Sequence, residues 1–198
     1  MKMAFILYDD LTVLDFVGFY DAVTRLKGMG FRPDLEWTVC ARTPEVRDGA
    51  GLRLRADAVP PTLEGFDLIF LPGGMGSRAL RKDEGFVGWL RTARACPLKV
   101  SVCTGSLLLG AAGFLEGKTA TTHPTAYGLL AEYTPKTTRE RLVDEGDVIT
   151  GGGVSTSIDL GLYLCERLAG AEARDKIAAQ MDYPYRAKPP LRPARTVG

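Results

Sequence analysis

One cysteine of this chain lies in a sequence context that favours nucleophilic chemistry. The stretch Val100-Ser-Val-Cys-Thr-Gly-Ser-Leu-Leu-Leu-Gly110 runs from small and apolar residues into Cys103, and then into good helix formers. A thiol at the carboxyl end of a strand, beside the positive end of a helix dipole, favours the reactive thiolate. The alternative is a small buried cysteine that ends a core strand. The local pattern leaves both interpretations open.

Asp15 is the first candidate partner of that thiol. It closely follows the first predicted strand, so it can face a cysteine at the end of a neighbouring strand. A carboxyl there would donate or accept a proton, or steer the sulfur by a hydrogen bond. Thr12-x-x-Asp15 also fits a capping box, in which the carboxyl binds the end of the helix instead.

Two glycines and the turn at the cysteine could bind developing negative charge. Gly73, Gly74 and the Cys103-Thr104 turn can supply paired backbone N–H groups to a substrate atom attacked by sulfur. The alternative is that the glycines only permit a tight turn between strand and helix. His123 could be the base of a cysteine–histidine pair, although a lone histidine beside a proline often only makes a structural hydrogen bond.

We expect neither a cofactor nor a metal. Gly74-x-Gly76-x-x-Ala79 formally matches a dinucleotide fingerprint, but Pro72 intrudes and the strand Lys99–Val102 ends without the ribose-binding acid. His123 is the only histidine, which excludes a zinc site with two histidines from this chain alone.

The composition indicates an ordinary globular protein. The chain has 198 residues, 45% hydrophobic and 25% charged, with a net charge of +1, so nothing indicates nucleic acid or an acidic membrane as a partner. No apolar run approaches the ~20 residues of a membrane span, and we expect no signal peptide. The four cysteines lie far apart, which fits a reducing, cytoplasmic setting.

Strands and helices alternate along the predicted chain. We expect strands or hairpins at 3–8, 35–41, 44–58, 66–71, 98–102, 118–122 and 139–150, and helices at 12–26, 84–94, 105–112, 125–133, 156–168 and 171–182. This order predicts an α/β doubly wound, mostly parallel sheet with its ligand site at the carboxyl ends of the strands. We assign 1–185 to a single domain and 186–198 to a proline-rich, basic tail, extended or loosely ordered.

Together, these features resemble the DJ-1/PfpI superfamily over about residues 3–183. The resemblance rests on five motifs in order: Leu14-Asp-Phe-Val-Gly18, Leu71-Pro-Gly-Gly-Met-Gly76, Ser101-Val-Cys-Thr-Gly-Ser106, Ala120-Thr-Thr-His123 and Thr150-Gly-Gly-Gly153. Within the superfamily, the motif around Cys103 is most similar to isonitrile (isocyanide) hydratases and to the ligand-sensing domains of AraC-type regulators. Those regulators carry a C-terminal helix-turn-helix region, for which this chain has no room.

The resemblance implies a fold and a set of roles. It implies a flavodoxin-like α/β sandwich, usually a homodimer, with Cys103 as nucleophile on a strained elbow. Asp15 would be the carboxylic residue near the sulfur, and Thr104 follows the cysteine as in the hydratases, where protease-like members have histidine. His123-Pro124 departs from the hydratases, which tend to have an aromatic residue after that histidine, and is more similar to DJ-1.

The expected function is therefore hydration of a small-molecule isonitrile to an N-substituted formamide, without a cofactor. Cys103 would form a thioimidate, Asp15 would shuttle the proton, and N–H groups near Gly74 and Thr104 would hold the polar atoms with the Thr104 hydroxyl. Three alternatives stay open. They are a glyoxalase- or hydrolase-like reaction on small carbonyl compounds, a redox or stress sensor in which Asp15 caps an oxidised Cys103, and a non-catalytic small-molecule sensor.

Overall fold

A six-stranded sheet forms the centre of the structure, a computed structural model that describes residues 1–185 and 189–192. The strands lie in the order β2-β1-β5-β6-β8-β7. Their bounds are β1 (Lys2–Ile6), β2 (Glu36–Cys40), β5 (Leu68–Leu71), β6 (Leu98–Val102), β7 (Leu142–Asp144) and β8 (Val148–Gly151). All neighbours pair in parallel except β7 and β8, which are antiparallel. The predicted doubly wound, mostly parallel sheet is thus confirmed.

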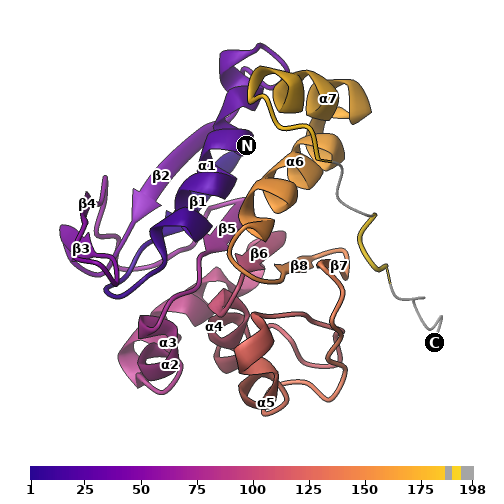
Figure 1. The fold of residues 1–198 in the computed structure, drawn as a ribbon. Helices are drawn as coiled ribbons and strands as arrows, with labels where there is room; N and C mark the ends of the chain where they lie inside the picture. Colours follow the sequence, from indigo (N-terminus) through magenta and orange to yellow (C-terminus); the bar gives the residue numbers. More distant parts are fainter. Residues whose placement is uncertain (186–188, 193–198) are drawn as a thin grey trace.

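Helices cover the sheet in two groups, which Figure 1 shows above and below the centre. The first group, α1 (Val13–Gly28), α6 (Thr156–Ala169) and α7 (Ala171–Gln180), packs together and onto β6 and β8. The second packs against β5 and β6 and consists of α2 (Gly76–Leu80), α3 (Glu84–Arg91), the 3₁₀ turn η1 (Thr92–Ala95), α4 (Gly105–Ala111), the 3₁₀ turn η2 (Pro124–Ala126) and α5 (Tyr127–Leu130). A hairpin of β3 (Glu45–Arg47) and β4 (Arg53–Arg55) lies beside the sheet.

The predicted elements agree with this structure except at two places. Residues 118–122 form no named strand, and Ala120 makes only an isolated bridge to Thr137. The helix α2 was not predicted because it is five residues long and no side chain caps its start. Of the predicted tail, the structure describes only residues 189–192, where Leu191 bridges to Val143 of β7. Residues 186–188 and 193–198 lie outside the described residues.

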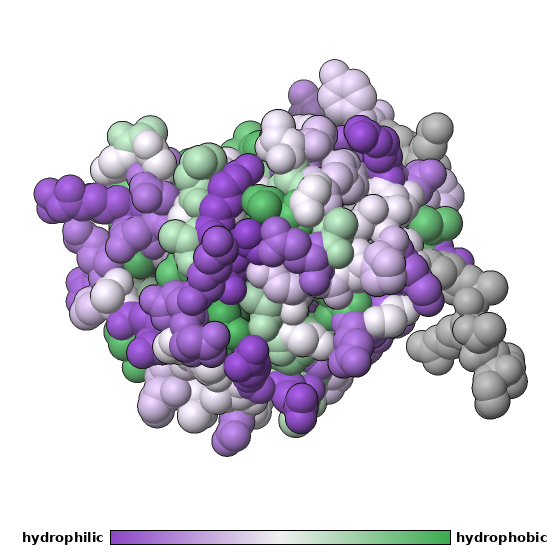
Figure 2. Space-filling model, turned by 90° about the horizontal axis from the view of Figure 1, so that it is seen from below, coloured by the Kyte–Doolittle hydropathy of each residue, from purple (hydrophilic) through white to green (hydrophobic). Residues whose placement is uncertain are grey.

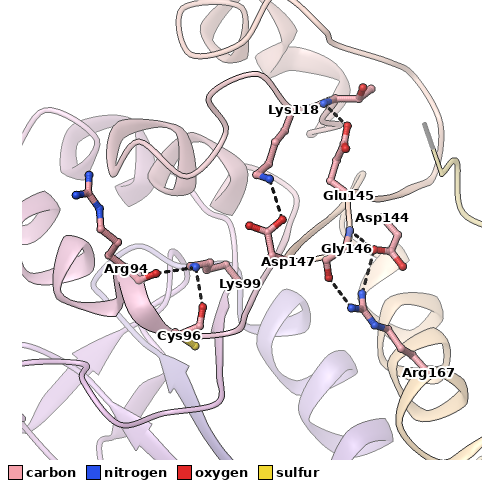
Figure 3. Close-up of polar contacts among 10 residues, drawn as sticks. Arg94, Cys96, Lys99, Lys118, Asp144, Glu145, Gly146, Asp147 and Arg167 are labelled. Atoms are coloured by element: carbon pink, nitrogen blue, oxygen red, sulfur yellow. Dashed lines mark hydrogen bonds and ion pairs between the residues drawn. The ribbon is translucent and has the colours of Figure 1, made fainter. Parts of the chain in front are cut away.

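Polar contacts hold the amino-terminal edge of the sheet together (Figure 3). The buried Lys99, at the start of β6, donates its ammonium hydrogens to the carbonyl groups of Arg94 (3.0 Å) and Cys96 (2.7 Å) at the end of η1. Across the edge, Lys118 pairs with Asp147 at 2.8 Å. Because a buried ammonium is costly without partners, these carbonyl groups fix where η1 ends and β6 begins. Among the described residues no helix is long and apolar enough to cross a membrane.

Close packing of α1 on α6 depends on small residues. A Cβ at Gly161 would lie 2.7 Å from the Cβ of Ala22 and 3.1 Å from the carbonyl oxygen of Phe19, so the backbones can approach only because position 161 has no side chain. This packing matters for function, because α1 carries Asp15 near its amino-terminal end.

We therefore expect Gly161→Ala to lower the free energy of unfolding by about 1–3 kcal/mol, the usual cost of overpacking a core. Gly88→Ala is the matched control, since a Cβ there meets nothing within 4 Å. It should stabilise the helix α3 by up to about 1 kcal/mol. Urea denaturation of the two variants measures both effects, and equal effects would contradict the packing argument.

Candidate active site

Cys103 lies on a strained turn between β6 and α4. It is a non-glycine residue with a positive φ of 55°, a conformation that typically costs about 1–3 kcal/mol. Hydrogen bonds on both sides maintain it. Its N–H donates to the carbonyl groups of Gly152 (2.7 Å) and Gly151 (3.0 Å), and its carbonyl accepts from the hydroxyls of Thr122 (3.0 Å) and Ser106 (3.1 Å). The turn thus holds the thiol at the carboxyl end of the central strand.

Asp15 faces this thiol from the first turn of α1. The side chain is fully buried, and its Oδ2 accepts a hydrogen bond from the N–H of Gly73 at 2.9 Å. Oδ1 is buried and has no hydrogen-bond partner among the described residues. The capping-box interpretation of Thr12 and Asp15 is wrong, because the Asp15 carboxyl binds the loop after β5 and the Thr12 side chain makes no capping bond.

The loop that holds Asp15 approaches the cysteine too closely for a side chain. A Cβ at Gly73 would lie 2.5 Å from the nitrogen of Thr104 and 2.7 Å from the Cβ of Cys103, so only glycine fits. The N–H of Gly73 binds Asp15, and the N–H of Gly74 donates to the Thr104 hydroxyl at 2.9 Å. These N–H groups were expected to bind substrate. In the structure they position the two side chains beside the thiol instead.

The hydroxyl of Thr104 is also engaged in hydrogen bonds within the protein. It donates to the carbonyl of Gly74 (3.0 Å) and accepts from the hydroxyl of Ser77 (2.8 Å), so it has no free donor for the substrate role that the sequence suggested. The backbone N–H of Thr104, however, lowers the pKa of the Cys103 thiol. Among the expected donors, the Thr104 N–H is the group placed to stabilise negative charge there.

His123 has a structural role in this conformation. Its Nδ1 accepts a hydrogen bond from the N–H of Thr125 at 3.3 Å and lies 2.9 Å from the Thr125 hydroxyl, which caps η2. Since Nδ1 is the acceptor, the proton of the neutral ring lies on Nε2. Within the described part of the chain no hydrogen bond joins the ring to Cys103 or Asp15.

Burial controls the protonation of the thiol and the carboxyl. It raises the pKa of Cys103 to about 12, and the nearby Asp15 charge raises it further than the Thr104 N–H lowers it. Burial also raises the pKa of Asp15 to about 7, against the lowering effect of the Gly73 N–H. Desolvation therefore opposes the thiolate that the local pattern favours, and it acts against the dipole of the short helix α4.

Two further residues of the site were missed from the sequence. Tyr8 is buried beside Asp15 and Cys103 and donates its hydroxyl to the carbonyl of Pro72 at 2.6 Å. As the last residue of an apolar run, it could be interpreted only as core. Ser77 donates a hydrogen bond to the Thr104 hydroxyl. It lies on α2, a helix that the sequence did not predict because no side chain caps its start.

Comparisons with known proteins identify a family for this chain. Residues 1–167 match the DJ-1/PfpI family. The chain belongs to this family. It is 34% identical over 185 residues to an isonitrile hydratase of Pseudomonas putida, covering 92% of this chain and 78% of that protein.

Two other relatives show how widely the family fold is used. A structure of a ThiJ/PfpI family protein from Pseudomonas syringae aligns with a TM-score of 0.82 at 28% identity, over 96% of this chain and 77% of that one. The transcriptional regulator CdhR of Pseudomonas aeruginosa is 31% identical over 171 residues, covering 83% of this chain but only 50% of the regulator. The family therefore contains both enzymes and regulators.

One face of the molecule, seen in Figure 2, carries apolar residues in separate patches among hydrophilic ones. Leu14 (43% exposed) and Met75 (67% exposed) adjoin Asp15 and Gly74 in sequence. Cys103 itself is only 5% exposed, so a reactant must be narrow to reach this residue.

The raised pKa of Asp15 predicts a pH-dependent stability. A carboxyl whose pKa rises from 3.8 in the unfolded chain to about 7 in the folded one stabilises the fold below pH 4, and this contribution is lost as the pH rises to 7. The loss amounts to roughly 4 kcal/mol. Urea denaturation from pH 4.5 to 8 should show it in the wild type and not in Asp15→Asn. An equal pH dependence in the two proteins would refute the assignment.

The pKa of Cys103 should fall when Asp15 loses its charge. In Asp15→Asn the repulsion between carboxylate and thiolate disappears, while burial of the sulfur persists. We expect the pH midpoint of Cys103 alkylation by iodoacetamide, followed by peptide mass spectrometry, to shift downward but to stay above 9. The buried Cys165 serves as the internal control, and its reactivity should be equal in both proteins. A higher Cys103 midpoint in the variant would contradict this electrostatic account.

Proposed function

We propose that the protein is a cofactor-independent cysteine enzyme of the cytoplasm that hydrates small isonitriles to N-substituted formamides. One observation supports it above the others, namely a buried thiol and a buried carboxyl that shift each other's pKa, with one carboxyl oxygen lacking a hydrogen-bond partner among the described residues. The identity to a known isonitrile hydratase over most of the chain supports the same reaction.

The first step uses Asp15 as a base and then as an acid. The Asp15 carboxylate accepts the thiol proton as the Cys103 sulfur forms a bond to the terminal isonitrile carbon. The same proton then passes to that carbon, and a thioimidate, R–N=CH–S–Cys103, results. Because the proton moves between neighbouring groups, no resting thiolate is needed. A pKa near 7 lets the carboxyl accept and return the proton near neutral pH.

The second step hydrolyses the thioimidate. Asp15 is again a carboxylate. It accepts a proton from a water molecule while the oxygen of that water molecule attacks the imidate carbon. The carbon–sulfur bond then breaks, the nitrogen gains one proton, and the sulfur regains the other. The sum is isonitrile plus water to formamide, with the enzyme unchanged. The Thr104 N–H, which lowers the pKa of the thiol, stabilises the negative charge that develops on the sulfur as it leaves.

The accessibility of the site suits this substrate class. The terminal carbon of an isonitrile belongs to a linear, slender group, which suits a cysteine residue that is only 5% exposed. The exposed apolar side chains of Leu14 and Met75 would contact the substituent on nitrogen. A carbonyl compound would present its carbon inside a wider planar group, which this approach accommodates less well.

The raised pKa of Cys103 argues against the redox-sensor alternative. Peroxide oxidises the thiolate, and a thiol with a pKa of about 12 supplies very little of it at neutral pH. We therefore expect peroxide treatment to leave Cys103 unoxidised under conditions that leave the enzyme active.

Incubation with a panel of aryl and alkyl isonitriles, followed by detection of the formamide, tests the proposal. We expect turnover whose kcat/KM rises with pH through about 7, because Asp15 must begin as the base. Cys103→Ala should lose at least about 1,000-fold, and Asp15→Asn about 100- to 10,000-fold.

The matched control is Cys96→Ala, which removes a buried thiol that binds only the carbonyl of Leu98. It should keep the wild-type rate. Formamide production by a folded Cys103→Ala variant at the wild-type rate, or no turnover of any isonitrile by the wild type, would refute the proposal.

A further inference from the structure

The edge strand of the sheet carries a second feature, far along the chain from the cysteine. Residues 189–192 lie against β7, where Leu191 pairs in parallel with Val143. The N–H of Leu191 donates to the carbonyl of Leu142, and the N–H of Asp144 donates to the carbonyl of Leu191, both at 2.9 Å. An edge strand with free N–H and C=O groups is a template for adding another extended segment. Here the chain's own tail is the added segment.

The next residue of the tail, Arg192, contacts a cluster of polar and aromatic groups, although 65% of its side chain is exposed. The guanidinium of Arg192 donates to the Tyr163 hydroxyl at 2.6 Å, lies 3.6 Å from the Asp144 carboxylate and lies over the Tyr163 ring at 5.9 Å. Tyr163 in turn donates its hydroxyl to Asp144. A carboxylate, a phenol oxygen and an aromatic face together recognise a guanidinium rather than a generic cation.

The groups that make this site belong to the folded sheet and to α6, and not to the tail. The Asp144 side chain is only 6% exposed and is fixed from its other side by Arg167 at 3.0 Å and by the N–H of Gly146 at 2.7 Å (Figure 3). The site therefore keeps its shape when the tail leaves. Beside it, a cavity of about 800 Å³ between the tail and the helices α6 and α7 is lined by Leu162, Tyr163 and Ala178.

We propose that the β7 edge is a recognition site for an extended segment of a partner protein in which an apolar residue precedes arginine, and that the chain's own Leu191-Arg192 occupies it as an intramolecular competitor. Two hydrogen bonds to β7 bind the extended backbone of the segment. Asp144 and Tyr163 bind the guanidinium of its arginine. The tethered tail is present at an effective concentration of the order of millimolar, so a partner binds well only when the tail leaves.

A labelled, end-blocked Pro-Pro-Leu-Arg peptide tests the proposal by fluorescence anisotropy on the full chain. The variant Leu191→Pro with Arg192→Ala removes the N–H and the guanidinium that dock the tail, and leaves the site itself unchanged. We expect it to bind the peptide at least about tenfold more tightly than the wild type. Pro189→Ala, which retains both docking residues, is the matched control and should bind like the wild type.

The specificity is tested by changing the peptide and keeping the protein the same. The double variant should lose its tighter binding when the peptide arginine is replaced by glutamine, or when the order of the two residues is exchanged to Arg-Leu. Equal binding of the three peptides, or no gain in the released variant, would overturn the proposal. Self-association of the wild type that the peptide reverses would also overturn it, because the tails would then be exchanged between copies.

Discussion

Burial of the Asp15 carboxyl against the Cys103 thiol is the constraint on which the rest of the site depends. A carboxyl removed from water needs hydrogen bonds, and one of its oxygens receives the Gly73 N–H. That bond requires the loop after β5 to touch the cysteine turn, which only a glycine at position 73 allows. It also requires α1 to be held in place, and Gly161 on α6 lets the two helices pack closely. Distant parts of the sequence thus serve one buried contact.

The same burial determines the chemistry. Burial opposes the charged form of both groups, and the charge of Asp15 raises the pKa of Cys103 further, whereas the thiol lowers the pKa of Asp15. The result is a protonated thiol beside a carboxyl that titrates near neutral pH. In the proposed reaction, such a pair is suited to moving a proton over a short distance. Thr104, Gly74 and Ser77 keep the arrangement rigid through a closed set of hydrogen bonds.

The sequence predicts the fold and the central pair well, for identifiable reasons. Short, mostly apolar runs such as 66–71 and 98–102 are typical of buried strands, and chemically reactive residues after parallel strands meet at one edge of the sheet. What the sequence could not predict depends on three-dimensional contact. The Thr104 hydroxyl proved to be a support because its partners come from residues 74 and 77. The pKa of the Cys103 thiol is raised, whereas the sequence predicted a lowered one. The local sequence pattern indicates the helix dipole but not the desolvation of the sulfur. Tyr8 ends the first apolar run, so the sequence indicated a core residue and not its hydrogen bond to the Pro72 carbonyl.

The protonation of Asp15 is the quantity that tests the account most directly. Carbon-13 NMR of the aspartate carboxyl groups, with the Asp15 signal assigned by its absence in Asp15→Asn, follows its titration from pH 4 to 9. The account predicts a midpoint near 7, as burial beside Cys103 requires. A midpoint near 4, the value of an exposed aspartate, would contradict the central claim.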